Sequence, residues 1–281
     1  MSTNKLSRGA ARFIGIICAL IFGLSLLAAG YAICCFRPTT AIISQNTSNF
    51  EQAPYTSADL VSLAVSSRDF TVDNHLLEGM DGAATELAQA VIEAARSSSA
   101  ALGTEGLWRD AAITLINSPV AEENPLETMY ALAQINESYG FSPEAISHLT
   151  DCNNLIVPIN TLLIVLFLIG IALLIWLLVR DQKRIAGLSL MVAPLVMVAF
   201  FALAAIWAIL DWRGLFSFFH AIFFPQGNWT FPADSLLILM YPAEFWQTMA
   251  SVWAVVTLVL SILVFFIGFR LFKVNDRKAR Q

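Results

Sequence analysis

Four long apolar runs dominate the pattern of hydrophobic and polar positions along the chain. They cover residues 13–36, 156–179, 185–210 and 248–272. Each run reaches or exceeds the roughly 20 residues with which a helix crosses a hydrocarbon core of about 30 Å. A helix satisfies its own backbone hydrogen bonds within lipid, so each run predicts a membrane-spanning helix. The pattern therefore predicts an all-α integral membrane protein with four transmembrane helices.

The composition supports this interpretation. Of the 281 residues, 57% are hydrophobic and 13% are charged, and the mean hydropathy is +0.68. An average soluble domain has about 45–50% apolar and about 25% charged residues. No basic face exists outside the short segments beside the apolar runs, so nucleic acid is not expected as a partner.

Lys and Arg residues divide the polar segments into two sets. Eleven of the sixteen lie in or beside the segments 1–12, 180–184 and 273–281, which carry a net charge of +9, whereas the other segments carry −14. Positive segments stay on the cytoplasmic side, so we expect both termini to be cytoplasmic and residues 37–155 and 211–247 to be extracytoplasmic. We interpret the first apolar run as an uncleaved anchor, because it is longer than the 7–15 apolar residues of a signal peptide.

The first outer segment has the periodicity of helices rather than of strands. A stretch rich in Ser, Thr and Asn, from Thr39 to Asn49, is expected to be a linker. Thr56 and Asp59 have the spacing of a capping box that opens a helix. Apolar residues recur at helical spacing in "ATELAQAVIEAARSS", "LWRDAAITLI" and "PLETMYALAQI". We therefore predict an extracytoplasmic helical domain between the first and second transmembrane helices.

The last part of this segment, "FSPEAISHLTDCNNLIVP", predicts a helix that leads to the second apolar run. Ser142 suits the N-cap, Pro143 the first helical position, and Glu144 the positive end of the helix. His148 and Asp151 are three residues apart and therefore share a face of that helix. From this position the carboxylate is expected to hold the imidazole in one tautomer and to raise its basicity.

The second outer segment, 211–247, is short and aromatic. Its stretch "GLFSFFHAIFF" is apolar on all sides and too short to span a membrane, so we expect an interfacial or re-entrant piece. Pro225 and Gly227 mark a turn. The aromatic residues near the two membrane boundaries are typical of an interfacial belt: Trp212, Trp229, Tyr241 and Trp246.

All three histidines lie in the expected outer segments. His148 precedes the second apolar run and His220 follows the third, so both are expected near the outer leaflet surface. A histidine there has two interpretations, a general acid or base near neutral pH or an amphipathic residue of the interfacial belt. Two histidines lie on converging segments, and one has a carboxylate nearby. This arrangement gives the acid–base interpretation about the same weight as the interfacial-belt interpretation. His75 is interpreted as a solvated loop residue.

Other kinds of site have no clear signature here. The chain lacks zinc-binding spacings, a Gly-x-Ser-x-Gly elbow, a P-loop and a dinucleotide fingerprint, so neither a metal nor a cofactor is expected. The apolar runs contain no interior charge, which argues against an ion pathway. Cys152 is expected at a depth similar to that of Cys34 and Cys35; a disulfide is conceivable, but we favour unpaired thiols.

Two stretches resemble the paired signatures of a bacterial integral membrane family. They are "FSPEAISHLTDCNNL", with a His-x-x-Asp motif, and "FFHAIFFPQGNWTFPADSLLILMYPAEFW", with a Phe-His-x-x-Phe-Phe motif. The family includes the lipoprotein intramolecular transacylase of Gram-positive bacteria. Leu149, Cys152 and the turn "PQGN" depart from the residues that the family favours, and residues 73–139 take no part in the resemblance.

The resemblance implies an acyl shift within one substrate, a lipoprotein with a diacylglyceryl group on its N-terminal cysteine. The enzyme would move the sn-2 acyl chain to the α-amino group of that cysteine and leave a lyso-form lipoprotein. His148, oriented by Asp151, and His220 would act as acid and base, in an order that the sequence leaves open. Substrate contacts are expected from six residues, with the phenylalanines lining the acyl chains and the asparagine near the oxyanion: Phe219, Phe223, Phe224, Asn228, Trp229 and Ser235.

Two alternatives remain open. One is a non-catalytic membrane protein whose outer domain binds a partner, and the other is an acyl hydrolase or transferase that acts on free lipid. In the main interpretation the partners are a diacylated lipoprotein and membrane lipid, and the chain is a multi-pass protein of the bacterial plasma membrane with its active site near the outer leaflet. The sequence leaves open the oligomeric state, the identity of the substrate lipoproteins and the role of residues 73–139.

Overall fold

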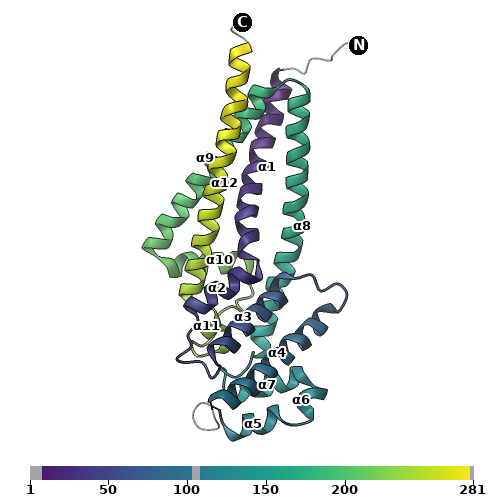
Figure 1. Ribbon diagram of the computed structural model, residues 1–281, viewed down its shortest axis with the longest axis vertical. Coiled ribbons are helices and arrows are strands. Elements are labelled where there is room, and N and C mark those ends of the chain that lie inside the picture. Colours follow the sequence, from purple (N-terminus) through teal and green to yellow (C-terminus); the bar gives the residue numbers. More distant parts are fainter. Residues whose placement is uncertain (1–7, 103–107, 279–281) are drawn as a thin grey trace. The chain divides into compact units, whose positions relative to one another are not determined.

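The computed structural model describes residues 8–102 and 108–278, and every regular element in those residues is a helix (Figure 1). Lys5 and Arg280, two of the residues used for the charge argument, lie outside the described residues. The helices, in chain order, are α1 (Arg8–Cys34), α2 (Arg37–Thr47), α3 (Ser57–Val72), α4 (Gly79–Leu102), α5 (Asp110–Ile116), α6 (Val120–Glu123), α7 (Pro125–Ile135), α8 (Pro143–Val179), α9 (Lys183–Leu210), α10 (Trp212–Phe223), α11 (Leu236–Met240) and α12 (Ala243–Lys278).

Four of these helices, α1, α8, α9 and α12, are long and apolar enough to cross a membrane. This confirms the predicted fold class of a helical protein with four candidate membrane spans. Helix α8 has 37 residues, which corresponds to a rise of roughly 55 Å. That length exceeds a hydrocarbon core of about 30 Å. Because the apolar part of α8 begins at Ile156, the turns before it, with His148, precede the membrane-spanning segment.

The chain forms two compact units, and the first comprises α1 up to Ile33, residues 159–215 and the chain from Ser251 onward. Figure 1 shows α1, α8 and α12 running alongside one another in this unit. Its core consists of Cys18, Phe22, Leu177, Ala186, Leu190 and Ala193. Many of its large apolar side chains instead face outward, with Leu203 and Ile209 exposed by 70% and 83%. Such a surface suits contact with lipid rather than water.

Small residues allow the long helices to approach closely. A Cβ atom added to Gly187 of α9 would lie 2.6 Å from the carbonyl oxygen of Gly268 in α12, and one added to Gly268 would lie 2.7 Å from that of Gly187. Membrane helices commonly associate through such small-residue contacts, since burial of apolar surface drives little association within lipid. The two glycines therefore fix the place where α9 and α12 cross.

The second unit comprises residues 34–158 and 216–250 and has its own core. Its largest fully buried side chains include Leu60, Met129, Leu132, Tyr139, Phe141, Leu236, Leu239 and Phe245. The segment around α11 is attached to earlier parts of the unit by backbone hydrogen bonds. Leu236 N donates to Glu137 O at 2.9 Å, and Asn49 N donates to Leu239 O at 2.8 Å. These bonds join the two stretches of sequence that carry the motifs into one unit.

Several local predictions for this unit are confirmed. The Thr56 hydroxyl caps α3 by accepting a hydrogen bond from Asp59 N at 3.2 Å. The Ser142 hydroxyl likewise accepts from Ala145 N at 3.2 Å at the start of α8. Helix α7 coincides with the stretch "PLETMYALAQI". In α4 the predicted apolar stripe is buried: Leu87, Val91, Ile92 and Ala95.

The linker predicted for Thr39 to Asn49 is wrong, because most of it is helix α2. Its polar residues make bonds that a helix accommodates. Asn46 Nδ2 donates to Ile42 O at 2.6 Å and Thr47 Oγ1 donates to Ile43 O at 2.8 Å. Ile43 is buried against the rest of the unit. Tertiary packing has thus overridden the weak local helix preference of Ser, Thr and Asn.

Candidate functional site

The second unit brings His148 of α8 and His220 of α10 together. Their ring centroids lie 6.1 Å apart with an interplanar angle of 31°. The side chains are also withdrawn from solvent, because the two residues are only 8% and 9% exposed. Two residues separated by 72 positions in the sequence therefore form one pair, as the two motifs predicted.

Aromatic rings surround this pair. The ring of Phe224 meets the His148 ring edge-on at 4.8 Å, and Phe231 lies 5.8 Å from it. On the other imidazole, Phe216 lies 4.0 Å and Trp229 lies 4.9 Å from the His220 ring. Apolar walls reduce the access of water and strengthen electrostatic interactions at the enclosed polar groups.

The protonation pattern of His220 follows from its hydrogen bond. Its Nδ1 lies 2.8 Å from the carbonyl oxygen of Phe216, one turn earlier in α10. A carbonyl oxygen only accepts, so Nδ1 carries the proton. In the neutral ring, Nε2 then has a free lone pair, which makes it a hydrogen-bond acceptor and a base.

His148 has the complementary pattern. Its Nε2 lies 3.7 Å from the Cys152 sulfur, and burial raises the pKa of that thiol to about 12, with a further contribution from Asp151. The thiol is therefore protonated near neutral pH, and its sulfur can either donate to Nε2 or accept from it. His148 Nδ1 is buried and has no hydrogen-bond partner among the described residues. When the thiol donates, the imidazole proton is on Nδ1 and the pair offers one donor and one acceptor.

Asp151 does not hold His148 as the shared helix face predicted. Its carboxylate instead accepts hydrogen bonds from Gln226 Nε2 at 2.8 Å and from Asn228 Nδ2 at 2.7 Å. These two donors come from the turn after α10, so the carboxylate ties that turn to α8. The amide donors of the turn bind the Asp151 carboxylate, and a spacing of three residues could not indicate this. Gln226 is a site residue that sequence reasoning missed.

Both imidazoles are disposed to be neutral. Burial, the largest cause, and the nearby His220 lower the pKa of His148 from its ordinary value of 6.5 to about 4, against an opposing effect of Asp151. Burial also lowers the pKa of His220, and its hydrogen bond to Phe216 opposes this. Each charged ring would be poorly solvated. Both imidazoles are therefore neutral at pH 7 when no substrate is bound.

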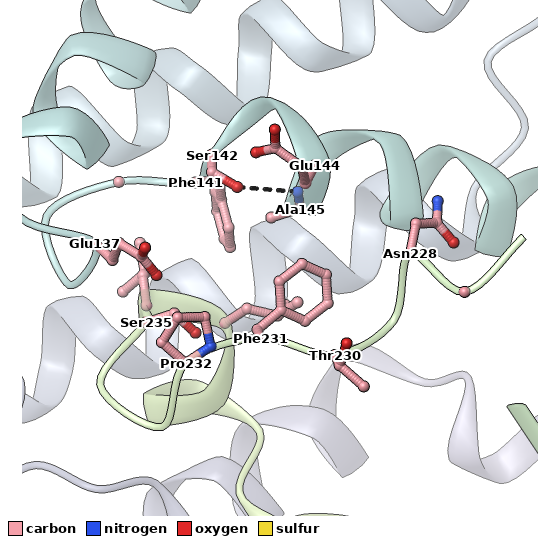
Figure 2. Close-up of a pocket in the computed structure, with 14 residues that line it drawn as sticks. Glu137, Phe141, Ser142, Glu144, Ala145, Asn228, Thr230, Phe231, Pro232 and Ser235 are labelled. Carbon is pink, nitrogen blue, oxygen red and sulfur yellow. Dashed lines mark hydrogen bonds between the residues drawn. The ribbon is translucent and has the colours of Figure 1, made fainter. Parts of the chain in front are cut away.

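The other predicted contact residues divide into three groups. Phe219 and Phe223 lie on α10, are 47% and 40% exposed, and their rings contact each other at 4.8 Å. Phe224 and Trp229 contact the imidazoles directly. Asn228 and Ser235 instead line a cavity of about 340 Å³ next to the pair, which Figure 2 shows.

The cavity lies between the start of α8 and the segment that leads to α11. Figure 2 shows the Phe231 ring between these two parts of the chain. Two polar atoms of the lining residues are buried without a hydrogen-bond partner among the described residues, Asn228 Oδ1 and Ser235 Oγ. Buried polar atoms are seldom left unpaired in folded proteins, so these two are candidates for contact with a ligand.

No disulfide joins any of the four cysteines, all of which lie in the described residues. Cys34 Sγ donates to Met249 O at 3.6 Å, whereas Cys152 faces His148. Within residues 8–102 and 108–278, no three His, Cys, Asp or Glu side chains gather in an arrangement that could hold a metal ion. The groups described at this site are the two imidazoles and the side chains around them.

Comparison with known proteins finds a family match. The sequence model of the family described as lipoprotein intramolecular transacylase Lit matches residues 116–246. The searches of curated proteins and of solved structures each find no match. The matched range includes His148, Asp151, His220 and the turn between α10 and α11. The resemblance to this family is therefore confirmed over residues 116–246. Because the match begins at residue 116, the expectation that residues 73–139 take no part in the resemblance is wrong for residues 116–139.

Proposed function

We propose that this protein moves the sn-2 acyl chain of a diacylglyceryl lipoprotein to the α-amino group of the lipoprotein's N-terminal cysteine. The family match supports a transacylase that acts on lipoproteins. The observation that carries the specific reaction is the buried pair of His148 and His220, one of which offers a proton and the other a lone pair. Such a pair suits a reaction that removes a proton from an amine and gives one to an oxygen.

The reaction needs three proton movements and one acyl shift. The cysteine ammonium loses a proton, and the free amine attacks the carbonyl carbon of the sn-2 ester. The tetrahedral intermediate loses the remaining extra proton from nitrogen, the bond to the glyceryl oxygen breaks, and that oxygen is protonated. The products are an amide and a lyso-glyceryl hydroxyl, with one proton released to solvent. Because amine and ester belong to one substrate, proximity supplies much of the rate.

The two imidazoles take different parts in this scheme. His220 accepts a proton from the substrate nitrogen at Nε2, since its Nδ1 is already bonded to Phe216 O. In this proposal the Cys152 thiol donates to His148 Nε2, so the proton of that ring is on Nδ1. His148 gives this proton to the glyceryl oxygen and takes up at Nδ1 the proton that His220 has accepted, so both rings end neutral. Their lowered pKa values keep both rings neutral and ready before the substrate binds. The aromatic enclosure disfavours hydrolysis of the ester by water.

The exposed phenylalanines of α10 have the role of binding the acyl chain in this proposal. Phe219 and Phe223 lie on the same helix as the buried His220, with Phe218 also half-exposed. An acyl chain that lies against these rings would bring its ester toward the imidazoles. In this proposal the second unit is extracytoplasmic, and the site works at the outer leaflet of the bacterial plasma membrane.

The test is expression of the chain in a bacterial host whose lipoproteins are diacylated, followed by mass spectrometry of their N-terminal peptides. We expect lyso-form lipoproteins with an N-acyl cysteine. His148→Ala and His220→Ala should each lower the yield or rate at least about a hundred-fold, the lower range of general acid–base contributions.

His75→Ala is the matched control, because this third histidine bonds to Glu78 and Phe70 O in a separate loop. It should keep the activity of the unchanged chain. Unmodified diacyl peptides despite good expression would refute the transacylase. Release of free fatty acid would instead favour the acyl hydrolase, and full activity in either His148→Ala or His220→Ala would remove that residue from the mechanism.

A further inference from the structure

The cavity beside the imidazole pair continues into a second one. The first has a volume of about 340 Å³ and the second about 600 Å³. They share Glu137, Ser142, Glu144 and Pro232 in their linings, so together they form one elongated depression, here called the acidic groove. It runs along residues 137–144 on one side and 232–235 on the other.

The charged residues that line the groove are all negative. The described residues that line it include three carboxylates, Glu137, Glu144 and Asp234, and no Lys or Arg. The start of α8 does not offset this charge for a ligand, because Ser142 already caps the helix and Glu144 occupies its first turn (Figure 2). The groove therefore favours a cationic ligand over an anionic one.

The groove also contains a buried polar group without a partner. Ser235 is only 7% exposed, and its hydroxyl oxygen has no hydrogen-bond partner among the described residues. It precedes α11 but makes no capping bond to that helix. Asn228 Oδ1, on the lining nearer to the imidazoles, is unpartnered too. Both oxygens can accept a hydrogen bond, and the N–H groups of an extended peptide are suitable donors.

The groove begins at the reaction site. Asn228 lines it while donating to Asp151, and Phe231 lines it while its ring contacts His148. A polypeptide attached to a cysteine at the imidazole pair would therefore pass these two residues and enter the groove. A small cation would fill only part of so long a space, whereas an extended chain advances about 3.3 Å per residue and could follow it.

We propose that the acidic groove binds the peptide segment that follows the lipidated cysteine of the substrate, and that it selects segments carrying Lys or Arg. This inference rests on the proposed function for the identity of the substrate. Backbone N–H groups of the segment bond to Ser235 Oγ and Asn228 Oδ1. Its basic side chains lie against Glu137, Glu144 and Asp234.

The test uses synthetic lipopeptides with a diacylglyceryl cysteine and equal peptide lengths, in which the following residues include either Lys, Gln or Glu. The full-length chain in detergent should show a kcat/KM for the Lys peptide about three- to ten-fold above that for the Glu peptide, the range expected for partly exposed ion pairs. The combined Glu137→Gln and Glu144→Gln chain should reduce this ratio to near one. Its melting temperature in detergent should stay near that of the unchanged chain, which a general loss of fold would not allow.

Glu93→Gln is the matched control, because it removes one negative charge from the exposed face of α4, outside the groove. It should leave the ratio unchanged. Binding of the same peptides to the His220→Ala chain shows the preference without turnover. Selective binding by the unchanged chain without any acyl shift would support the groove and refute the transacylase. An equal response to the Lys and Glu peptides, in rate and in binding, would refute the groove whether or not the acyl shift occurs.

Discussion

At the residue scale, the site depends on which ring nitrogens are free. His220 uses Nδ1 for a bond within its own helix, and His148 uses Nε2 for the thiol one turn later. Each imidazole thus contacts a neighbour four residues away, and in the proposed mechanism the two remaining nitrogens have opposite roles. An interfacial belt residue has no need for such an arrangement, which favours chemistry over the belt interpretation for this pair.

Asp151 has a positioning role that a graded series of substitutions can test. Asp151→Ala removes the acceptor for both Gln226 and Asn228 and should lower kcat/KM about ten- to a hundred-fold by releasing the turn. Asp151→Asn keeps one acceptor oxygen and should fall between Asp151→Ala and the unchanged chain. Gln226→Ala, which deletes one of the two bonds, should have a smaller effect. If Asp151→Ala retains full activity, the turn is held by other contacts.

The lowered pKa of His148 predicts a pH-dependent stability. Because the folded chain disfavours the charged ring, the unfolded chain binds more protons between about pH 4 and 6.5. The contribution of this residue therefore falls as the pH falls through that window, by on the order of 2 kcal/mol at pH 5. His148→Gln removes this contribution, so its melting temperature should decline less than that of the unchanged chain between pH 7 and pH 5. Parallel declines would contradict the assignment.

Sequence predicted the residues of the site better than their contacts. The two histidines could be identified because each lies at the end of an apolar run, within a recognisable motif. The two hydrogen-bond donors to Asp151 could not be identified from the sequence. They are Gln226 and Asn228, which lie 75 and 77 positions away in the chain. Nothing in local spacing indicates which of several donors a folded turn brings nearest.

At the element scale, the crossing of α9 and α12 depends on two glycines. In an exposed helix, Gly→Ala would add about 1 kcal/mol of helix stability. At Gly187 and Gly268 the new Cβ would instead lie within 3 Å of backbone oxygen atoms, which cannot move aside cheaply. We expect Gly268→Ala to lower the melting temperature in detergent by several degrees. Gly9→Ala, in open space on α1, should leave it unchanged or raise it.

The linker predicted for Thr39 to Asn49 is also an error at the scale of the element, because most of this segment is α2. Ser, Thr and Asn are common in linkers because their side chains compete for backbone hydrogen bonds. In α2 these side chains bond to carbonyls one turn back, so they coexist with the helix. Ile43 and Thr40, both buried, hold the helix against the rest of the unit. Local composition could not foresee this burial.

At the scale of the whole molecule, the charge pattern predicts which side of the membrane each loop occupies. Cysteine labelling of intact cells can test this prediction in a chain whose four native cysteines are replaced by alanine. Leu77→Cys, at a fully exposed position between α3 and α4, should react with a membrane-impermeant maleimide from outside. Arg180→Cys, in the short turn before α9, should react only after permeabilisation. The reverse pattern would place the imidazole pair on the cytoplasmic side and refute the outer-leaflet proposal.

The sequence by itself determined the all-helical class, the four candidate spans and the two motifs that meet at the site. These features depend on hydrophobicity and helical period, which local sequence expresses directly. The tertiary structure alone decided the meeting of the two imidazoles, the attachment of Asp151 to the turn, and the acidic groove beside Phe231. Each of these depends on contacts between segments distant in the chain, and their geometry is set by packing of the whole second unit rather than by the order of the residues.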